Sequence, residues 1–360
     1  MNKLLRALLY ISLACFIGVI ITLLVNSSSP LLGPLIAGMF VTLALGVRGT
    51  NTVFKSFSFT LWIFSSVSLA MFYPHWFLEV GGFKLSALIV PLIQIIMFGM
   101  GTSLSVQDFM GVLKMPKGVA VGIGLQYTVM PIVGISLALA FGFPPEIAAG
   151  VVLIGSSPGG VASNVMAYIA NSNLALSVTL TAISTLLSPF VTPALMQLLA
   201  GQFVPIEFMA MMWSIIKMII IPIVLGVLFN YFLHGKMKWL DDAMPVLSMT
   251  GIAVIITIIT AAGRDSLLAV GLLLVLAAMI HNAAGYVFGY WGARLARLDE
   301  KSCRAIAIEV GLQNAGMASG LAVAMGKIGT VGLAAAVFGP WMNITGSTLA
   351  NYWRRKPVKE

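Results

Sequence analysis

Long apolar stretches separated by short polar gaps run along almost the whole chain. A run of about 17–25 mostly apolar residues is typical of a helix that crosses a membrane. Twelve such runs are present, and the pattern places their ends to within a few residues. They cover residues 6–25, 31–47, 57–75, 86–104, 119–141, 147–170, 174–199, 208–232, 245–262, 267–293, 303–325 and 329–352. The chain is therefore predicted to be an all-α polytopic membrane protein.

The first run shares one property with a signal peptide, because Lys3 and Arg6 precede it. However, the apolar run from Ala7 to Val25 is longer than a signal-peptide core of about 7–15 residues, and no A-x-A cleavage site follows it. We therefore expect a retained helix. Residues 1–55 then form two additional N-terminal transmembrane helices.

Composition and charge support a membrane protein and exclude a nucleic-acid-binding one. Hydrophobic residues make up 59% of the chain and charged residues only 9%, against about 25% charged in soluble domains. The net charge is +9, but Lys and Arg lie at helix ends and form no basic patch. If the spans alternate, one side of the membrane receives only Lys84, Arg264 and Lys327. The positive-inside rule then predicts that both termini are cytoplasmic, in a cell inner (plasma) membrane protein.

The charges assigned to the cytoplasmic side lie before the first span, in alternate gaps and in the tail. They are Lys3, Arg6, Arg48, Lys55, Lys114, Lys117, Lys236, Lys238, Arg294, Arg297, Lys301, Arg304, Arg354, Arg355, Lys356 and Lys359. Residues that enzymes use are sparse. The chain has two cysteines and three histidines, none at metal-ligand spacing, and no nucleophile–base pair or phosphate-binding loop. We expect no enzymatic activity.

Two polar, glycine-rich segments interrupt otherwise apolar spans. They are GSSPGGVASN at 155–164 and EVGLQNAGMAS at 309–319. Glycine, proline and polar residues unwind a helix at membrane depth, where the freed backbone groups must find other partners. Each segment lies in the fourth span of a five-span group. Because five is odd, residues 56–200 and 201–355 are predicted to form inverted repeats, as in secondary transporters, followed by a tail at 356–360. The alternative is two unrelated glycine-rich packing faces.

Glu309 is the only carboxylate deep within a predicted span. A charge there costs at least about 2.5–3.5 kcal/mol, so it normally has a partner and a function. A carboxylate beside free backbone carbonyls suits a hard cation that prefers oxygen ligands. The alternatives are a carboxyl kept neutral by burial, or a pair with Lys217. Lys217 lies within a span, where it extends to a headgroup, fills a polar gap between helices or contacts substrate.

Other polar side chains extend this candidate site. Ser177 and Thr181 are four residues apart and so share a helix face, and Gln126 lies mid-span in a preceding helix. Asn343 and Thr345 are expected at the corresponding place in the second repeat. Each of these side chains also has a simpler interpretation as a hydrogen bond between helices.

Each helix break also creates a half-helix N-terminus, whose free N–H groups favour an anion. These ends are expected near Val161–Ala162 and near Asn314–Ala315. If the repeat brings the two ends together at the membrane midplane, they would hold a carboxylate. An anionic substrate beside bound cations is therefore predicted.

The chain resembles a known family over residues 56–355. The runs IMFGMGTSLSVQDF, EIAAGVVLIGSSPGGVASNVMAYIANSNLALSVTLTAISTLLSPFVTPAL and IEVGLQNAGMASGLA are similar to bacterial members of the bile acid:sodium symporter (BASS) family, as are IHNAAGY and WMNITGS. The resemblance implies ten helices in a core and a panel domain, with two crossed broken helices. The two N-terminal helices come in addition.

The resemblance also implies two sodium sites and a substrate site at the crossing. The first sodium site would comprise Ser163, Asn164, Ser177, Thr181 and Glu309. The second would comprise Gln126, Glu309, Gln313 and the backbone carbonyls of Val310 and Leu312. Substrate would lie near Val161, Ala162, Asn314 and Asn343.

Two departures from the family pattern concern the substrate. Many family members have a histidine where this chain has Met342, and many bacterial members have CCPGGT where this chain has SSPGGV.

The resemblance as a whole implies a monomeric, sodium-coupled symporter in the lipid bilayer. Its cargo would be a small organic anion, bile-acid-like or a small carboxylate such as pantoate or a 2-oxo acid. The alternatives are a proton-coupled or exchange-type exporter on the same fold, and a membrane sensor or scaffold that binds ligand without transport.

Overall fold

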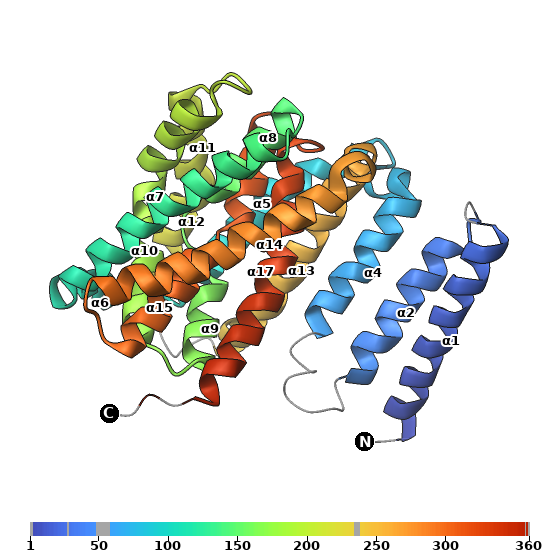
Figure 1. The fold of residues 1–360 in the computed structure, drawn as a ribbon, viewed down its shortest axis with the longest axis horizontal. Coiled ribbons are helices and arrows are strands. Elements are labelled where there is room, and N and C mark those ends of the chain that lie inside the picture. The colour runs from blue at the N-terminus through green and yellow to red at the C-terminus, as the bar shows by residue number, and fades with distance from the viewer. Residues whose placement is uncertain (1–2, 27–28, 48–57, 234–237, 357, 359–360) are drawn as a thin grey trace.

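The computed structural model describes residues 3–26, 29–47, 58–233, 238–356 and 358. Four of the charges used to predict the orientation, at positions 48, 55, 236 and 359, lie outside the described residues, as does the domain boundary at residue 55. Within the described residues the chain is helical almost throughout (Figure 1). The long helices and half-helices are α1 (Lys3–Val25), α2 (Leu32–Gly46), α4 (Ser58–Phe72), α5 (Ile89–Thr102), α7 (Pro116–Ala140), α8 (Pro145–Gly155), α9 (Ala162–Ile169), α10 (Leu174–Leu195), α11 (Phe208–Ile215), α12 (Ile221–Leu233), α13 (Lys238–Ala262), α14 (Arg264–Leu295), α15 (Glu300–Gly311), α16 (Ala315–Ala324) and α17 (Val331–Arg354).

The prediction of an all-α polytopic membrane protein is confirmed, and both predicted helix breaks are present. The sixth span consists of α8 and α9, and the eleventh consists of α15 and α16. Six segments of the described chain are long and apolar enough to cross a membrane by themselves: Lys3–Val25, Leu85–Thr102, Pro116–Ala140, Leu174–Ala200, Phe208–Phe232 and Arg264–Leu295. Several of the other spans contain shorter α-helices, either because a break divides the span or because part of the span forms a 3₁₀ turn.

The structure also contains small elements that the apolar pattern did not predict. A short antiparallel hairpin, β1 (Glu79–Val80) and β2 (Phe83–Lys84), connects the 3₁₀ turns Pro74–Phe77 and Leu85–Leu88. The amphipathic helix α6 (Val106–Lys114) precedes α7, and π-helical turns follow α10 (Met196–Ala200) and join α11 to α12 (Ile216–Ile220). These elements are too short to produce an apolar run of membrane-spanning length.

The helices in contact form two sets that mirror each other. The pairs α4–α13, α7–α8, α8–α17 and α9–α10 have the counterparts α5–α12, α14–α15, α10–α15 and α16–α17. This is the contact pattern expected of two similar five-span repeats, and the division at residues 56–200 and 201–355 stays a prediction. We call α4, α5, α11, α12 and α13 the panel helices, and α7 to α10 with α14 to α17 the core helices.

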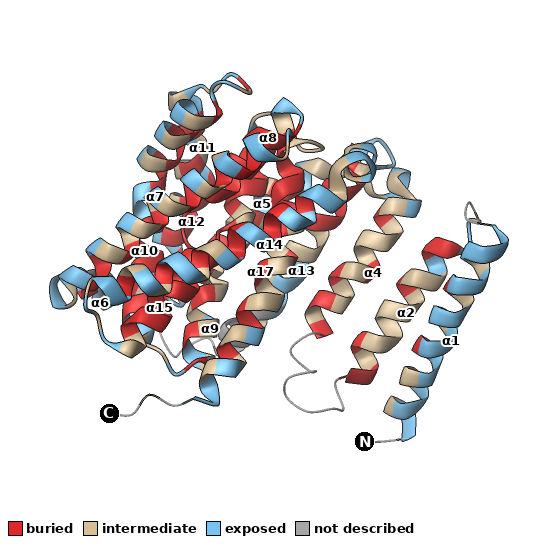
Figure 2. Cartoon of the chain, viewed as in Figure 1, coloured by how far each residue is buried: buried red, intermediate tan, exposed pale blue. Residues whose placement is uncertain are grey.

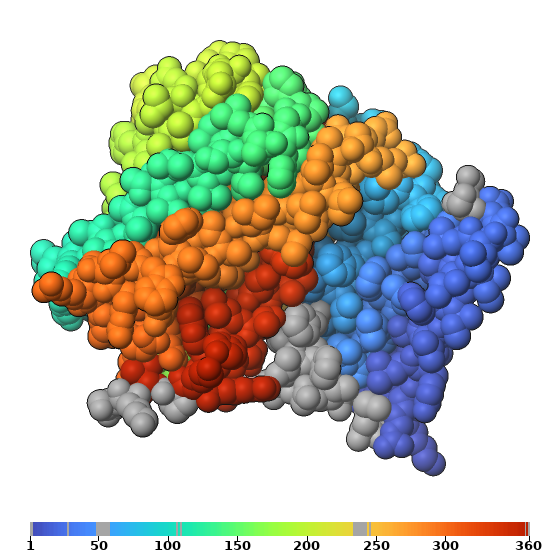
Figure 3. Space-filling model, viewed as in Figure 1, coloured from blue at the N-terminus to red at the C-terminus, as the bar shows by residue number. Residues whose placement is uncertain are grey.

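At one edge of the molecule, α2 packs against the panel helix α4, and α1 packs against the outer side of α2 (Figures 1 and 3). Ser65 in α4 donates to the carbonyl of Ala37 in α2 at 3.1 Å, and Tyr73 donates to the carbonyl of Pro30 at 2.6 Å. Most of α1 is exposed and apolar, as expected of a helix surrounded by lipid. Burial is instead concentrated in α8 and α15, the half-helices that lead into the two breaks (Figure 2).

Candidate functional site

The two helix breaks meet and hydrogen-bond to each other. The backbone N–H of Gly160 donates to the carbonyl of Leu312 at 2.7 Å, and that of Asn314 donates to the carbonyl of Pro158 at 2.9 Å. Gly159 and Gln313 pair as an antiparallel bridge. Backbone groups that leave a helix at membrane depth need such partners, because lipid offers none. We call this meeting of residues 156–161 with 312–314 the crossing. The predicted crossing of two broken helices is confirmed.

Glycine is required in the first break because the second approaches it so closely. A Cβ atom at Gly159 would lie 2.0 Å from a carboxylate oxygen of Glu309, and one at Gly160 would lie 2.8 Å from the carbonyl of Gln313. Any larger residue would separate the two segments. Pro158 adds to the break because it has no N–H to continue the helix. The local sequence thus both ends α8 and leaves room for the carboxylate.

The residues predicted for the first cation site lie together on α9, α10 and α15. The Thr181 hydroxyl donates to Glu309 Oε1 at 2.6 Å, and the Ser177 hydroxyl lies 3.1 Å from Glu309 Oε2. Both hydroxyls also lie within 3.2 Å of Asn164 Oδ1, and Ser163 Oγ lies 3.3 Å from Thr181 Oγ1. We call these five residues the first cluster. It offers only oxygen atoms, the ligands that a hard cation prefers.

The Glu309 side chain is buried, with 2% of the residue exposed. In the described part of the chain it forms no ion pair, and Lys217 lies exposed on the π-helical turn between α11 and α12. The alternative that Lys217 neutralises Glu309 is therefore wrong. A buried carboxylate without a cationic side chain is costly, so a bound cation or a proton is the remaining way to compensate it. The described residues contain no group of three His, Cys, Asp or Glu side chains at metal-ligating distance.

Four of the residues implied for the second cation site form a neighbouring group. Gln126 Nε2 donates to Gln313 Oε1 at 2.5 Å and to the carbonyl of Ser157 at 2.8 Å. Gln313 Nε2 in turn donates to the carbonyl of Val310 at 2.6 Å. We call Gln126, Val310, Leu312 and Gln313 the second cluster. The hydrogen bonds seen for Glu309 run to the first cluster, so the two clusters are joined through the backbone that links Glu309 to Val310.

The implied substrate residues surround the crossing. Val161 and Ala162 begin α9, whose first turn has no side-chain cap. Asn314 precedes α16, and its Oδ1 accepts from the Met317 N–H at 3.0 Å, while its buried Nδ2 has no partner among the described residues. Asn343 is partly exposed on α17. The two half-helix N-termini therefore meet, but α16 is already capped by its own asparagine and α9 is not.

One expected correspondence between the repeats is wrong. Ser177 and Thr181 are the fourth and eighth residues of α10, and the fourth and eighth residues of α17 are Ala334 and Phe338. Asn343 and Thr345, which were expected at this place, lie further along α17. The second repeat thus has apolar side chains at the places where the first has hydroxyls.

Several polar residues that support the site were missed. Ser184 and Thr192 continue the buried face of α10 that begins with Ser177 and Thr181. Ser184 Oγ accepts from the Gly159 N–H at 3.3 Å, and Thr192 donates to the carbonyl of Ser156 at 2.8 Å. The spacing of hydroxyls at 177, 181, 184, 188 and 192 is helical and was the available signal.

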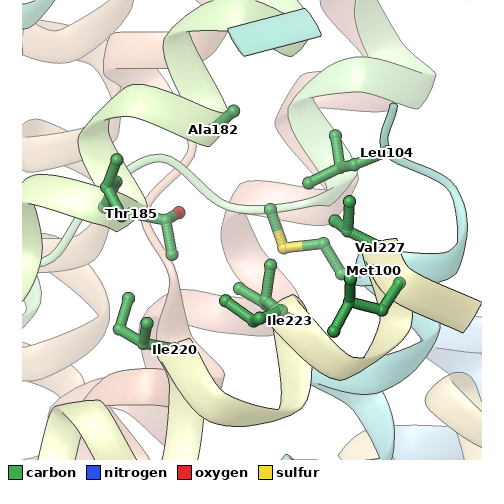
Figure 4. A pocket seen from close by; sticks show the side chains of 10 residues that line it. Met100, Leu104, Ala182, Thr185, Ile220, Ile223 and Val227 are labelled. Carbon is green, nitrogen blue, oxygen red and sulfur yellow. The ribbon is translucent and has the colours of Figure 1, made fainter. Parts of the chain in front are cut away.

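A cavity of about 200 Å³ lies between the panel and the core, and none of its lining residues belongs to either cluster (Figure 4). Its wall is apolar except for Thr185, so it is not a cation site. The lining residues come from α5 and the segment after it, α10, α12 and the π-helical turn before α12: Met100, Leu104, Ala182, Thr185, Leu186, Ile220, Ile223, Val224, Val227 and Leu228. The cavity shows that α10 packs incompletely against the panel at this level.

Comparison with known proteins gives a consistent family. A model of the Sodium Bile acid symporter family matches residues 89–270. The chain is 38% identical over 308 residues to the uncharacterized sodium-dependent transporter YocS of Bacillus subtilis, covering 85% of this chain and 94% of that one. It is 35% identical to the probable chloroplastic sodium/metabolite cotransporter BASS1 of Oryza sativa (85% and 74% covered) and 32% identical to the human ileal sodium/bile acid cotransporter (65% and 68% covered). The chain therefore belongs to the sodium bile acid symporter family and is a transporter rather than an enzyme.

Proposed function

We propose that this protein moves a small organic anion together with sodium ions by alternating access. The observation that carries the proposal is the buried Glu309 carboxylate, which lies at the crossing among hydroxyl and amide oxygens of α9 and α10. Sodium neutralises this carboxylate and takes its remaining ligands from the same oxygens. In the absence of the ion, the Ser177 and Thr181 hydroxyls donate hydrogen bonds to the side-chain oxygens of Glu309 or Asn164. Rotation of each hydroxyl turns a lone pair toward the ion.

The second cluster supports a second sodium ion. Gln126 Oε1 is buried and has no hydrogen-bond partner among the described residues. The carbonyl oxygens of Val310 and Leu312 are held by weak neutral donors, the Gln313 amide and the Gly160 N–H. A cation placed there would gain these oxygens as ligands and would release Gln313 Oε1 from Gln126. Two ions per cycle are proposed on this basis.

The anion is expected beside the sodium ions, at the meeting half-helix ends. The first turn of α9 has no side-chain cap, and its Ser163 and Asn164 N–H groups donate only to the carbonyls of Gly160 and Val161, at 2.9 and 3.3 Å. Such a half-helix end favours an anion, and Asn314 Nδ2, which has no partner among the described residues, supplies a further donor. Met342 is buried here, and its sulfur accepts from the Gln313 N–H at 3.2 Å. This thioether and Val161 leave little polar recognition for a large hydroxylated substrate. A small carboxylate, such as a 2-oxo acid or a pantoate-like hydroxy acid, is therefore favoured over a bile salt.

The charge balance predicts that transport responds to voltage. Two sodium ions and a monoanion carry one net positive charge inward. At 100 mV, negative inside, that charge adds about 2.3 kcal/mol to the driving force of the sodium gradient. This holds for the proposed orientation, with both termini cytoplasmic in the plasma membrane. Uptake that neither depolarises the membrane nor depends on sodium would contradict symport.

The test begins with the substrate. Thermal unfolding of the purified protein is measured against a panel of organic acids, in sodium chloride and in choline chloride at equal ionic strength. A transported anion should raise the unfolding midpoint more in sodium than in choline, because the ions complete its site. Uptake of that anion into proteoliposomes is then measured with an inward sodium gradient. Uptake that follows a proton gradient, with sodium replaced, would instead support the exporter or antiporter in which Glu309 titrates.

A further inference from the structure

The break between α15 and α16 leaves carbonyl groups without helical partners, and each has a different replacement. The carbonyl of Val310 accepts from the Gln313 side chain, and that of Leu312 accepts from the Gly160 N–H. Gly311, between them, has its carbonyl bonded by Asn282 Nδ2 of α14 at 2.8 Å. Asn282 lies outside both clusters and outside the predicted substrate site.

Asn282 is held in one orientation by a chain of hydrogen bonds. Its Oδ1 accepts from the Thr345 hydroxyl at 2.5 Å, and the Thr345 oxygen lies 3.2 Å from the Tyr286 hydroxyl. Since Asn282 Oδ1 can only accept, Thr345 donates to it and Tyr286 donates to Thr345. The amide nitrogen must then face Gly311. Asn282 is 1% exposed, so water does not compete for these bonds.

The short asparagine side chain reaches the break because α14 and α15 are in close contact. A Cβ atom at Gly285 would lie 2.7 Å from the Cα atom of Gly311, and one at Gly289 would lie 2.9 Å from the Cα atom of Ala307. Glycine at Gly285 and Gly289, one turn apart, thus brings the two backbones together. The same feature keeps Asn282 beside the Gly311 peptide.

The Gly311 peptide lies between the two carbonyls of the second cluster. Glycine restricts its own backbone angles less than any other residue. Without an external partner, the peptide planes on either side of Gly311 could rotate and turn the carbonyls of Val310 and Leu312 away from an ion. The Asn282 amide supplies the missing restriction by fixing the carbonyl between them.

The first repeat contains a related arrangement. Gln126 of α7 donates to the carbonyl of Ser157 in the other break, 31 residues further along the chain, and Asn282 donates to Gly311, 29 residues further along. In each repeat, an amide from the preceding helix holds a carbonyl freed by the break. Gln126 Oε1 has no hydrogen-bond partner among the described residues, whereas both ends of the Asn282 amide are hydrogen-bonded to protein groups.

We propose that Asn282 is a positioning residue for the second cation site, which it serves by orienting the Gly311 peptide so that the Val310 and Leu312 carbonyls face one ion. The proposal rests on the proposed sodium coupling. Loss of an outer partner of a metal ligand typically weakens metal binding about 10–100-fold. The same range is expected here for the sodium-binding step at the second site.

The test uses sodium binding without any transported anion. The unfolding midpoint of the full-length protein is titrated with sodium chloride, with choline chloride keeping the ionic strength constant. Asn282→Leu has a similar volume and no donor. In it, Thr345 keeps the carbonyls of Trp341 and Met342 as acceptors, at 3.1 and 3.2 Å, so the loss is confined to Gly311. The expected result is an apparent sodium dissociation constant about 10–100-fold higher for one phase of the titration.

Two substitutions at Thr345 serve as the second variant and its control. Thr345→Val removes the Thr345 donor from the Asn282 oxygen without touching Gly311, so a smaller shift in the same direction is expected. Thr345→Ser keeps the donor and should titrate like the wild type. If Asn282→Leu does not fold, the Thr345 pair carries the test.

The outcomes separate three explanations. If Asn282→Leu and Thr345→Val lower the midpoint in choline but keep the wild-type sodium titration, Asn282 is merely structural and the proposal is overturned. If the wild type itself is not stabilised by sodium over choline, the proposed function fails first. A sodium titration weakened in Asn282→Leu and Thr345→Val, and unchanged in Thr345→Ser, supports Asn282 as the positioning residue.

Discussion

The half-helices α9 and α16 occupy related places in the two halves of the chain, yet they have very different surroundings. Helix α16 packs against α5, α11 and α13 of the panel, and the residues from Met317 to Ala322 are all buried. Helix α9 packs mainly against the core helices α10, α15 and α17, and Val165 and Tyr168 on it are 55% and 70% exposed. The panel covers one half-helix and leaves the other accessible.

This difference is informative because the predicted inverted repeat would direct the two half-helices away from the crossing toward opposite sides of the membrane. If the repeats are inverted, α16 leads to one side of the membrane and α9 to the other. The structure then corresponds to a state that is closed on the α16 side and open on the α9 side. The alternate state is expected to exchange the two environments, with α9 covered by the panel and α16 accessible. The following predictions test this comparison.

Removing the carboxylate is expected to have the largest effect. Glu309→Ala deletes the only acidic group in the two clusters, so sodium-dependent uptake should be abolished. Glu309→Gln keeps the shape without the charge and cannot release a proton, so it can at most mimic a permanently protonated carboxyl and retain partial, uncoupled activity if the coupling ion is a proton. Both variants are measured by uptake into proteoliposomes under a sodium gradient. Wild-type uptake in either one would exclude Glu309 as the coupling residue.

Filling the contact between α16 and the panel should shift the balance between the two states. A Cβ atom at Gly320 would lie 2.8 Å from Ile93 Cδ1 and 3.3 Å from Met218 Sδ. Overpacking of about 1–3 kcal/mol in Gly320→Val corresponds to about a 5–150-fold change in the equilibrium. The variant should favour the state in which α9 is covered. The change is measured as slower labelling of a cysteine at Tyr168.

The matched control is Gly124→Val on the exposed face of α7. No atom lies within 4 Å of a Cβ added at Gly124, so this valine should leave the labelling rate unchanged. Equal labelling in Gly320→Val and in the control would mean that the α16 contact does not govern exposure of α9.

Cysteine labelling also measures directly how accessible positions on α9 and α16 are. In a background with Cys15 and Cys303 replaced by alanine, Tyr168→Cys should react at least about tenfold faster than Leu321→Cys with a membrane-impermeant thiol reagent, because buried positions react only through rare openings. Leu321 is fully buried on α16. Sodium with the transported anion should reduce the ratio by populating both states. A ratio near one in the ion-free protein would contradict the assigned state.

The smallest effect is expected at the outer ends of the half-helices. After α16, Lys327 pairs with Glu146 at the start of α8, and the Thr330 hydroxyl donates to the same carboxylate at 2.6 Å. The corresponding contact beyond α9 is uncharged, from Asn173 Nδ2 to Ser302 Oγ at 3.0 Å. Exposed pairs of this kind contribute about 0–1 kcal/mol, so Glu146→Gln should lower the unfolding midpoint only slightly.

The contribution of the Lys327–Glu146 pair to the stability of the folded protein should depend on pH. The hydrogen bond from Lys327 holds the pKa of Glu146 below its ordinary value of 4.5. A depressed pKa means that the stabilisation is complete above the unfolded-state pKa and is lost as the pH falls through the lower folded-state pKa. The wild type should therefore lose its advantage over Glu146→Gln below about pH 4.5. An advantage that persists at lower pH would assign the effect to packing instead.

Most of the fold and three residues of the first cluster, Glu309, Ser177 and Thr181, were predictable from local signals in the sequence, whereas Ser163 and Asn164 came from the family resemblance. Apolar runs located the membrane helices, and the consecutive residues Pro158, Gly159 and Gly160 marked the place where the helix is interrupted. A single buried carboxylate beside hydroxyls spaced four residues apart indicated a cation site. The second cluster needed the family resemblance, because backbone carbonyls leave no trace in the sequence.

Tertiary structure decided the features that depend on how helices rotate and pack. Hydroxyls of α10 face Glu309, while the equivalent places on α17 are the apolar Ala334 and Phe338, a difference that span counting misassigned. Asn282 and Gly311 are 29 residues apart in sequence, and they meet only because glycines bring α14 and α15 together. The sequence by itself determined the membrane helices, their two breaks and the carboxylate between them. Which half-helix the panel covers depends on contacts between distant segments, which local patterns do not encode.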